Sequence, residues 1–264
     1  MGTFLTVLVA CTPPTAVGPS PAGGNAVPSR LRVAAASDLR LAMDDLAAGW
    51  TAAHPEIEIS VTYGSSGTLF SQIIEGAPYD IFFSADAELP RRLEDTGRAR
   101  EGATRLYAIG RICLWVRSES SLDVISRGLS ALTEGSVEAV AIANPEHAPY
   151  GRAAVAALQA AGLYDLVKTR LVLGENVSQA AQFVDSGGAD AGIIALSLAL
   201  SPPLSESGRH VVVPSDSYPP LEQGVLILSS TADPEIAGAT EFVDFVLGPR
   251  GRAVLDRYGF LPPP

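Results

Sequence analysis

The sequence predicts an α/β protein of two lobes, each a mostly parallel sheet flanked by helices. Short apolar runs alternate with amphipathic, helix-like stretches from Leu31 to the C-terminus, an order typical of parallel sheets covered by helices. The chain has 264 residues, of which 47 % are hydrophobic and 18 % charged, enough for one large or two small cores. Four of the strand-to-helix turns carry small neutral residues, and these predict a cleft between two units.

The first unit follows a β-α-β-α-β order. Apolar residues recur at helical spacing between Leu39 and Trp50, whereas Ile57, Ile59 and Val61 alternate as in a strand. Glycine and proline in 76–78 end the second helix. The expected elements are strand 31–36, helix 38–54, strand 56–63, helix 68–75 and strand 81–84.

The second unit begins near Arg111 and repeats the alternation of strands and helices. We expect strands at 112–116, 139–143, 171–173, 192–195 and 211–213, helices at 150–161 and 177–185, then strand 225–228 and helices 235–247 and 251–258. The chain is expected to cross between lobes near 107–111 and again near 217–224. This places 30–110 plus 224–264 in lobe I, 111–223 in lobe II, and 1–29 in a signal and tether.

The N-terminus resembles a lipoprotein-type signal. The apolar run 5–10 is far shorter than the roughly 20 residues of a membrane span. It ends in Leu8-Val9-Ala10-Cys11, which resembles a lipobox, so Cys11 is the expected lipidation site. No basic residue precedes the run, and a plain signal peptide with an incidental cysteine is the alternative. The Pro-, Gly- and Ser-rich stretch 13–29 predicts a flexible tether and an extracytoplasmic protein, either membrane-anchored or periplasmic.

Charge and motif content argue against several classes of function. The net charge of −11 leaves no basic footprint for nucleic acid. The three histidines are scattered, so we expect neither a metal site nor a cofactor. Neither a Gly-x-Ser-x-Gly elbow nor a Walker loop is present in the sequence, and we expect no enzyme activity. Cys113 stands in an apolar strand-like run, which predicts an inert core thiol.

The four turns between strands and helices share one chemistry. Each presents small neutral donors, and none holds a cation suited to pairing with an anion. A helix N-terminus offers unpaired N–H groups and the positive end of its dipole, so several aimed at one point would make an anion site. The sequence therefore predicts a small-oxyanion binding protein. The four turns are Ala35–Leu39, Gly64–Thr68, Ala148–Gly151 and Gly174–Val177.

Five motifs in unbroken order resemble the periplasmic molybdate-binding proteins of ABC transporters. They span the chain from about Leu31 to the C-terminus. The motifs are Ala34–Ser37, Gly64–Gly67, Ala77–Asp86, Asn144–Gly151 and Gly174–Val177, and the tail Gly248-Pro249 with Arg257–Phe260 fits as well. The resemblance implies a two-lobed type II periplasmic-binding fold, with molybdate or tungstate as a transported ligand and not a cofactor. We further expect a monomer that delivers the anion to an ABC permease.

The resemblance also implies which residues contact the anion. Ser37 and Ser66 match serines that donate through hydroxyl and backbone N–H groups, whereas Tyr150 and Val177 match backbone donors. Ser65 is a possible further ligand. Some members place a tyrosine hydroxyl where this chain has Ala195, so a water, Tyr79 or Ser197, or nothing, replaces that donor.

The identity of the anion stays open at this stage. A site made only of donors suits molybdate, which carries no proton at neutral pH, and disfavours phosphate, which does. Sulfate is also a dianion without a proton, and only cavity size separates it from molybdate. A sulfate or other oxyanion receptor, and an anion-sensing receptor without transport, are the alternatives.

Overall fold

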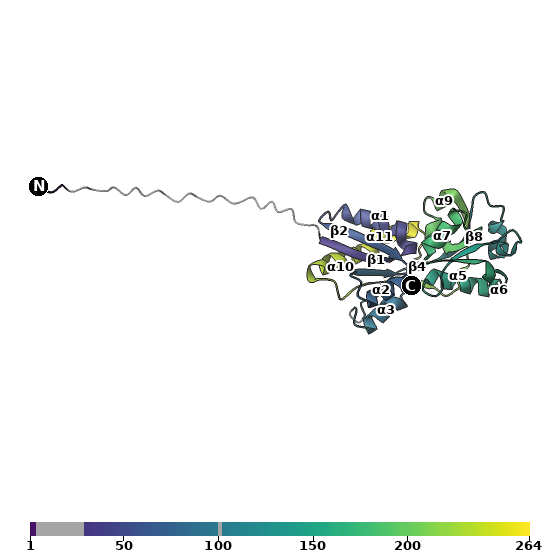
Figure 1. Cartoon of the computed structure of the whole chain (residues 1–264), viewed down its shortest axis with the longest axis horizontal. Coiled ribbons are helices and arrows are strands. Elements are labelled where there is room, and N and C mark those ends of the chain that lie inside the picture. The colour runs from purple at the N-terminus through teal and green to yellow at the C-terminus, as the bar shows by residue number, and fades with distance from the viewer. Residues whose placement is uncertain (4–28, 100–101) are drawn as a thin grey trace.

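The computed structural model describes residues 1–3, 29–99 and 102–264, and it has two lobes joined side by side (Figure 1). Each lobe contains a five-stranded sheet, in the order β2-β1-β3-β10-β4 in lobe I and β7-β6-β8-β5-β9 in lobe II. Within the described ranges, every helix is too short or too polar to cross a bilayer. Cys11 and nearly all of the expected tether lie outside these ranges.

Lobe I contains both ends of the described fold. It begins at Ser29, the last residue of the expected tether, which pairs with Ile57. Its elements are β1 (Ser29–Ala36), the 3-10 turn η1 (Ser37–Leu39), α1 (Arg40–Thr51), β2 (Ile57–Gly64), α2 (Ser66–Ile74), β3 (Ile81–Ser84), α3 (Glu88–Asp95), β4 (Arg105–Gly110), β10 (Leu221–Ile227), α10 (Asp233–Leu247) and α11 (Pro249–Arg257).

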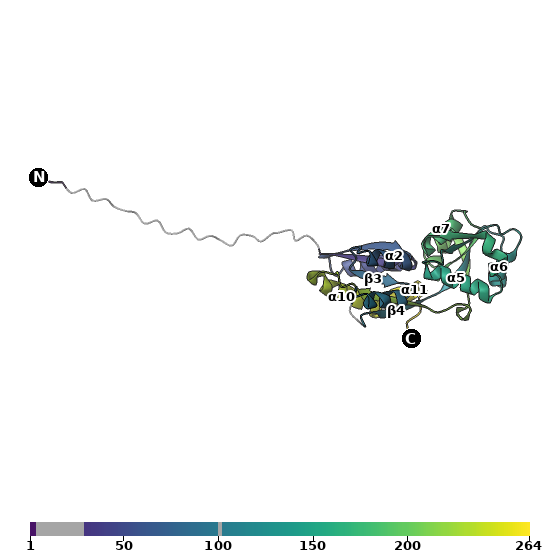
Figure 2. The ribbon, with the colours of Figure 1, turned by 60° about the horizontal axis from the view of Figure 1, so that its bottom comes forward.

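Lobe II is formed by the middle of the chain. Its elements are β5 (Ile112–Arg117), α4 (Val124–Arg127), η2 (Gly128–Thr133), β6 (Val140–Ala143), α5 (Pro149–Ala160), α6 (Tyr164–Val167), η3 (Lys168–Arg170), β7 (Leu171–Gly174), α7 (Val177–Asp185), β8 (Ala191–Ala195), α8 (Leu196–Ala199), α9 (Leu204–Ser207) and β9 (Gly208–Val212). The short turn η4 (Ser215–Ser217) lies on the return to lobe I. Figure 2 shows α5, α6 and α7 grouped in this lobe.

Each sheet is mostly parallel, as the sequence predicts, with a single reversed strand. In lobe I, β10 is antiparallel to both β3 and β4, whereas β1, β2 and β3 are parallel. In lobe II, β5 is the reversed strand, antiparallel to β8 and β9. Both reversed strands directly follow a crossing. They enter their lobe from the side where the other strands end, so they must run the opposite way.

The second crossing ends earlier than the sequence suggests. The expected boundary put residues up to 223 in lobe II, but Leu221–Gln223 pair with β4 of lobe I. Pro219 and Pro220 interrupt the apolar pattern before β10, and the register of its pairing with β4 shifts at Gln223/Gly224. For these two reasons the sequence pattern does not show where the strand begins. At the first crossing, Tyr107 is part of β4, and the chain passes from Gly110 through Arg111 into β5.

Helices cover both faces of the lobe I sheet. One face packs against α1, α10 and α11 through residues such as Leu46, Trp50 and Phe242, and the other packs against α2 and α3. Lobe II has one continuous cluster between its sheet and its helices, which α5 and α7 join. Cys113 is fully buried in that cluster, and burial raises the pKa of its thiol, in keeping with an inert core residue. These cores hold the strand ends in fixed positions.

Removing the Phe242 ring should destabilise lobe I. The ring is fully buried and lies 5.7 Å from Trp50 and 6.2 Å from Phe83, centroid to centroid. Phe242→Ala should lower the free energy of unfolding by about 3–5 kcal/mol, because it leaves a cavity in a packed core. Chemical unfolding followed by circular dichroism measures this. The exposed Ile125, on α4, is the control, and Ile125→Ala should change it by less than about 0.5 kcal/mol.

Candidate anion-binding site between the lobes

The four donor turns meet at one pocket between the lobes. They follow β1 and β2 of lobe I and β6 and β7 of lobe II, each at the carboxyl end of a parallel strand. Ser37, Ser66, Tyr150 and Val177, all predicted from the sequence, lie together here. The pocket is lined by Ala36, Ser37, Asp38, Gly64, Ser65, Ser66, Ala85, Ala148, Pro149, Tyr150 and Val177.

Backbone donors reach the pocket from four helix starts. Ser66, Tyr150 and Val177 occupy the first turns of α2, α5 and α7, where N–H groups have no acceptor within the helix. Ser37 begins the 3-10 turn η1 in the same way. All four residues are at least 97 % buried, so water cannot satisfy these donors freely. Such an arrangement is complementary to an anion.

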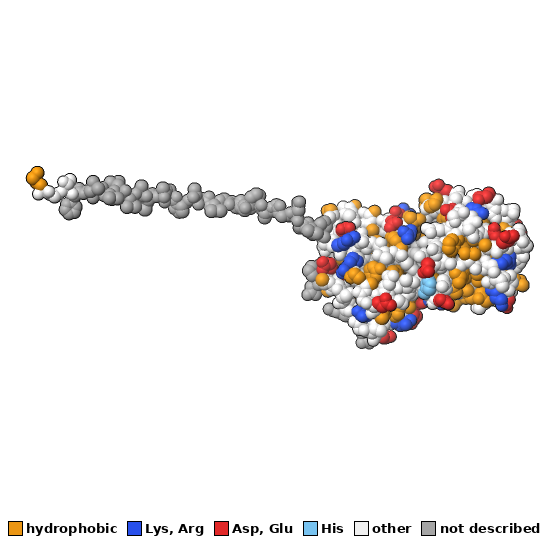
Figure 3. Space-filling model, viewed as in Figure 1, with side chains coloured by type: hydrophobic (Ala, Val, Ile, Leu, Met, Phe, Trp, Pro, Cys, Tyr) orange, Lys and Arg blue, Asp and Glu red, His pale blue; other side chains and the backbone are white. Residues whose placement is uncertain are grey.

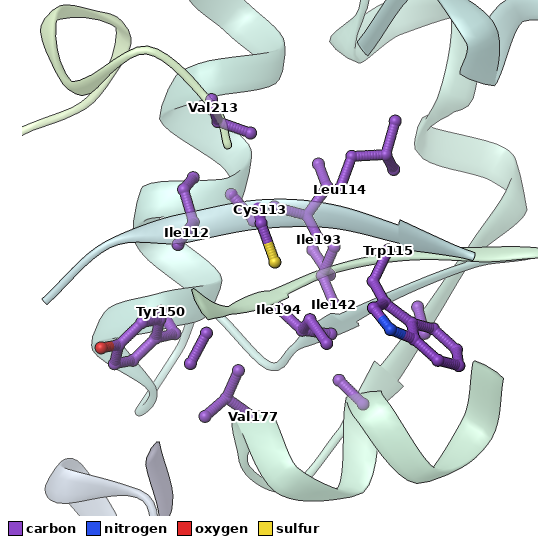
Figure 4. Close-up of a cluster of buried hydrophobic side chains, with 14 of the residues drawn as sticks. Ile112, Cys113, Leu114, Trp115, Ile142, Tyr150, Val177, Ile193, Ile194 and Val213 are labelled. Carbon is purple, nitrogen blue, oxygen red and sulfur yellow. The ribbon is translucent and has the colours of Figure 1, made fainter. Parts of the chain in front are cut away.

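Two serine hydroxyls add to the backbone donors. Ser66 Oγ accepts a hydrogen bond from the Ala85 N–H at 2.9 Å, so its own proton is free to donate into the pocket. The Ser37 hydroxyl makes no hydrogen bond to any described residue. Figure 4 shows Tyr150 and Val177 at one end of the lobe II cluster, with the Tyr150 hydroxyl pointing away from Cys113. The Tyr150 side chain therefore has another role, described below.

Ser65 lines the pocket, but its hydroxyl is engaged elsewhere. It caps α2 by accepting from the Thr68 N–H, and it is 2.8 Å from both Thr68 Oγ1 and His147 Nδ1. His147 belongs to lobe II, so this contact joins the two lobes. The Ser65 side chain thus acts in capping and closure.

Ala195 stands at a position where some relatives place a ligand hydroxyl, but it is not among the residues that line the pocket. It is fully buried at the end of β8, in the core of lobe II. The two hydroxyls considered as replacements bond elsewhere: Ser197 donates to the Asp38 carbonyl at 2.7 Å, and Tyr79 donates to Gln72. Position 195 therefore supplies no hydroxyl to the pocket.

Among the described residues, no lysine or arginine lines the pocket. Arg152, one residue beyond the α5 turn, pairs instead with Asp86 at 2.5 Å across the lobes, and both side chains are partly exposed. On the face drawn in Figure 3, acidic and basic side chains are interspersed without a broad basic field. Attraction for an anion must therefore come from local dipoles in a dehydrated pocket.

An acidic residue, Asp38, also lines the pocket, and the sequence patterns predict no role for it. Asp38 is 1 % exposed, and its Oδ2 accepts from the Tyr150 hydroxyl at 2.9 Å and the Gln223 amide at 2.6 Å. Burial raises the pKa of Asp38 to about 6, although these two hydrogen bonds oppose the shift. Burial and the Asp38 charge also raise the pKa of Tyr150 well above its ordinary value. The donor cage therefore has a carboxyl group beside it.

The lobes are closed in this structure, and hydroxyls of lobe II hold the η1 turn. Ser178 donates to the Ser37 carbonyl at 2.9 Å, and Ser197 donates to the next carbonyl. The Gly67 N–H donates to the His147 carbonyl at 2.9 Å on the other side. The pocket has a cavity of about 10 Å³, roughly the space of one water molecule, so an organic ligand of several carbons does not fit in this closed arrangement.

A pocket closed between two lobes, with donors from both, is the arrangement expected of a solute-binding protein. The chain belongs to the family described as bacterial extracellular solute-binding protein, whose model matches residues 31–261. It is accordingly an extracytoplasmic protein.

Two relatives and one solved structure refine this placement. The chain is 34 % identical to the molybdate-binding protein ModA of Azotobacter vinelandii over 88 % of its own length and 90 % of the relative. It is 31 % identical to the putative ABC transporter substrate-binding lipoprotein YvgL of Bacillus subtilis, over 87 % and 85 %. The Azotobacter vinelandii periplasmic molybdate-binding protein matches it with a TM-score of 0.81 and 32 % identity, over 89 % and 100 % of the chains. The fold is thus the two-lobed periplasmic-binding fold.

Gly67 should be required for closure. A Cβ atom at this position would lie 2.5 Å from the His147 carbonyl oxygen, which belongs to the opposite lobe. Gly67→Ala should therefore weaken anion binding at least about tenfold, because the lobes cannot meet, without changing the stability of the separate cores. Gly49→Ala is the control, since its Cβ would meet only the Phe245 ring, at 3.7 Å. Titration calorimetry and small-angle scattering with and without oxyanion measure both effects; an unchanged affinity would contradict the role.

Proposed function

We propose that this protein binds molybdate and delivers it to the permease of an ABC transporter. The observation that carries the proposal is the convergence of four helix N-termini on one small pocket, which no lysine or arginine of the described residues lines. The names of the relatives, which include molybdate-binding proteins, support the same ligand. Ser37, Ser66, Tyr150 and Val177 are the proposed contacts, and Ser65 completes the pocket mainly by holding it closed.

Further properties of the receptor belong to the same proposal. Tungstate should bind alongside molybdate, because it is a tetrahedral dianion with the same four acceptor oxygens. Cys11 should carry a lipid, which the lipobox-like residues before it and the lipoprotein name of one relative support. The protein should act as a monomer, since one pocket formed by two lobes of one chain is complete without a second copy.

Hydrogen bonding favours molybdate over phosphate. Each donor that meets a proton of hydrogen phosphate is left without an acceptor, which typically costs ~1–3 kcal/mol. Sulfate has no such mismatch and is separated by cavity size alone. A sulfate receptor, or a sensor that binds an anion without transport, is the second candidate, and the relatives favour it less.

Truncating either serine should weaken molybdate binding. Ser37→Ala and Ser66→Ala should each cost about 1.5–3 kcal/mol, the usual contribution of a hydrogen bond to a charged partner. Ser37→Ala is the cleaner variant, because the Ser66 hydroxyl also satisfies the Ala85 N–H. Ser71→Ala, at an exposed position on α2, is the matched control. Isothermal titration calorimetry reports the affinities, and equal values in wild type and both variants would rule out these contacts.

Titration with several oxyanions in parallel measures which of them the protein prefers. Protein lacking residues 1–28 is titrated with molybdate, tungstate, sulfate and phosphate. We expect nanomolar to micromolar binding of the first two, about −12 to −8 kcal/mol, and little heat from phosphate. Tighter binding of sulfate than of molybdate would instead support the second candidate. It would mean that the small residue at 195 accompanies a changed specificity.

A further inference from the structure

Asp38 is a buried acidic group that donor-only binding leaves unexplained. It lies in the η1 turn between Ser37 and Leu39 and lines the same pocket as the proposed anion contacts. A carboxylate beside a site for a dianion is unfavourable, since like charges in a poorly hydrated space repel strongly. When a dianion binds, the Asp38 carboxylate must therefore either lose its negative charge or be stabilised by other groups.

The hydrogen bonds around Asp38 are unevenly divided between its two oxygens. Oδ2 accepts from the Tyr150 hydroxyl and the Gln223 amide, which also lie 3.1 Å from each other. Oδ1 is buried and has no hydrogen-bond partner among the described residues. Backbone hydrogen bonding from the Asp38 and Leu39 N–H groups also lowers the pKa of the carboxyl, although no donor meets full hydrogen-bond geometry at Oδ1. Oδ1 is thus the oxygen with room for a proton.

In the part of the chain that the structure describes, the groups that face Asp38 supply no positive charge. Tyr150 of α5 and Tyr107 of β4 are the titratable side chains near it, and the raised pKa of each keeps it neutral at physiological pH. Gln223 of β10 adds only an amide, and Ser197 of α8 bonds the Asp38 carbonyl. Within the described ranges, Asp38 has no salt-bridge partner. Neutralisation of the carboxylate must therefore come from a proton.

We propose that Asp38 takes up a proton from solvent when the oxyanion binds, so that the closed site presents a neutral carboxylic acid to the dianion. The proton bonds to Oδ1, while Oδ2 keeps its two donors. In the anion-free closed form, burial has already raised the pKa of this carboxyl to about 6, and a nearby dianion raises it further. This inference rests on the proposed function, because it assumes a doubly charged ligand in the pocket.

The sign of the pH dependence follows from this linkage. The anion-free closed form is mostly ionised at Asp38 above about pH 6, and the anion-bound form as proposed is protonated there, so binding consumes a proton. Affinity should be constant below about pH 6 and should fall above it, by up to about tenfold per pH unit. Molybdate remains a dianion across this range, so the ligand itself does not produce the slope.

Calorimetry in two buffers measures the proton directly. Molybdate is titrated into wild-type protein at about pH 8 in Tris and in HEPES, whose ionisation enthalpies differ. The difference in observed heat gives the protons taken up, and we expect about one per anion. Wild-type protein that binds molybdate with no uptake would overturn the inference while leaving the proposed function intact. If molybdate does not bind, the proposed function fails. Proton uptake is then measured with whichever dianion, tungstate or sulfate, does bind.

Variants test whether Asp38 is the group that takes up the proton. Asp38→Asn keeps the shape and can still accept from Tyr150 and Gln223, so it should show no uptake and an affinity independent of pH. Tyr150→Phe removes one donor that favours the ionised form, so uptake at about pH 7 should shrink. Tyr63→Phe, whose hydroxyl bonds Asp44 elsewhere in lobe I, is the control and should match wild type. Unchanged proton uptake in Asp38→Asn would assign the proton to another group and overturn the inference.

Discussion

The contact between the η1 turn of lobe I and the hydroxyls of lobe II is the interaction on which the site depends. Ser178 and Ser197 donate to consecutive carbonyls of that turn, and Tyr150 donates to the Asp38 side chain. These bonds bring the α5 and α7 starts against the β1 and β2 turns. Without them the four helix N-termini would face water, where dipoles of this size attract an anion only weakly.

Strand direction explains why the donors can meet at all. Parallel strands end on the same edge of each sheet, so the turns after β1, β2, β6 and β7 lie on the edges that face the other lobe. The two crossings lie at the same edge, and Gly110 at the first has no room for a side chain beside the Tyr150 hydroxyl and the Gln223 amide. The buried Asp38 cluster is therefore packed against the crossings, about which the lobes must move when they close.

A cage of neutral donors and a buried carboxyl impose opposite demands, and the structure accommodates both. The donors require a dehydrated, closed pocket, whereas dehydration makes an ionised Asp38 costly. Two donors on Oδ2 moderate that cost, and an unpartnered Oδ1 leaves a place for a proton. The anion selectivity of the site and its response to pH thus arise from the same burial.

The sequence by itself determined the local elements and much of the site. Apolar periodicity located most helices and strands, and the small neutral residues at four strand ends indicated donor turns, because capping chemistry is local. The particular contacts Ser37, Ser66, Tyr150 and Val177 were implied by the resemblance to molybdate-binding proteins. Only the tertiary structure decided that the Ser65 hydroxyl serves closure, that Ala195 lies in a core, and that Leu221–Gln223 belong to lobe I. No local sequence pattern predicts the cluster of Asp38, Tyr150 and Gln223, because its residues come from three separate parts of the chain. Long-range packing sets which groups lose water, and that loss decides which of them hold charge.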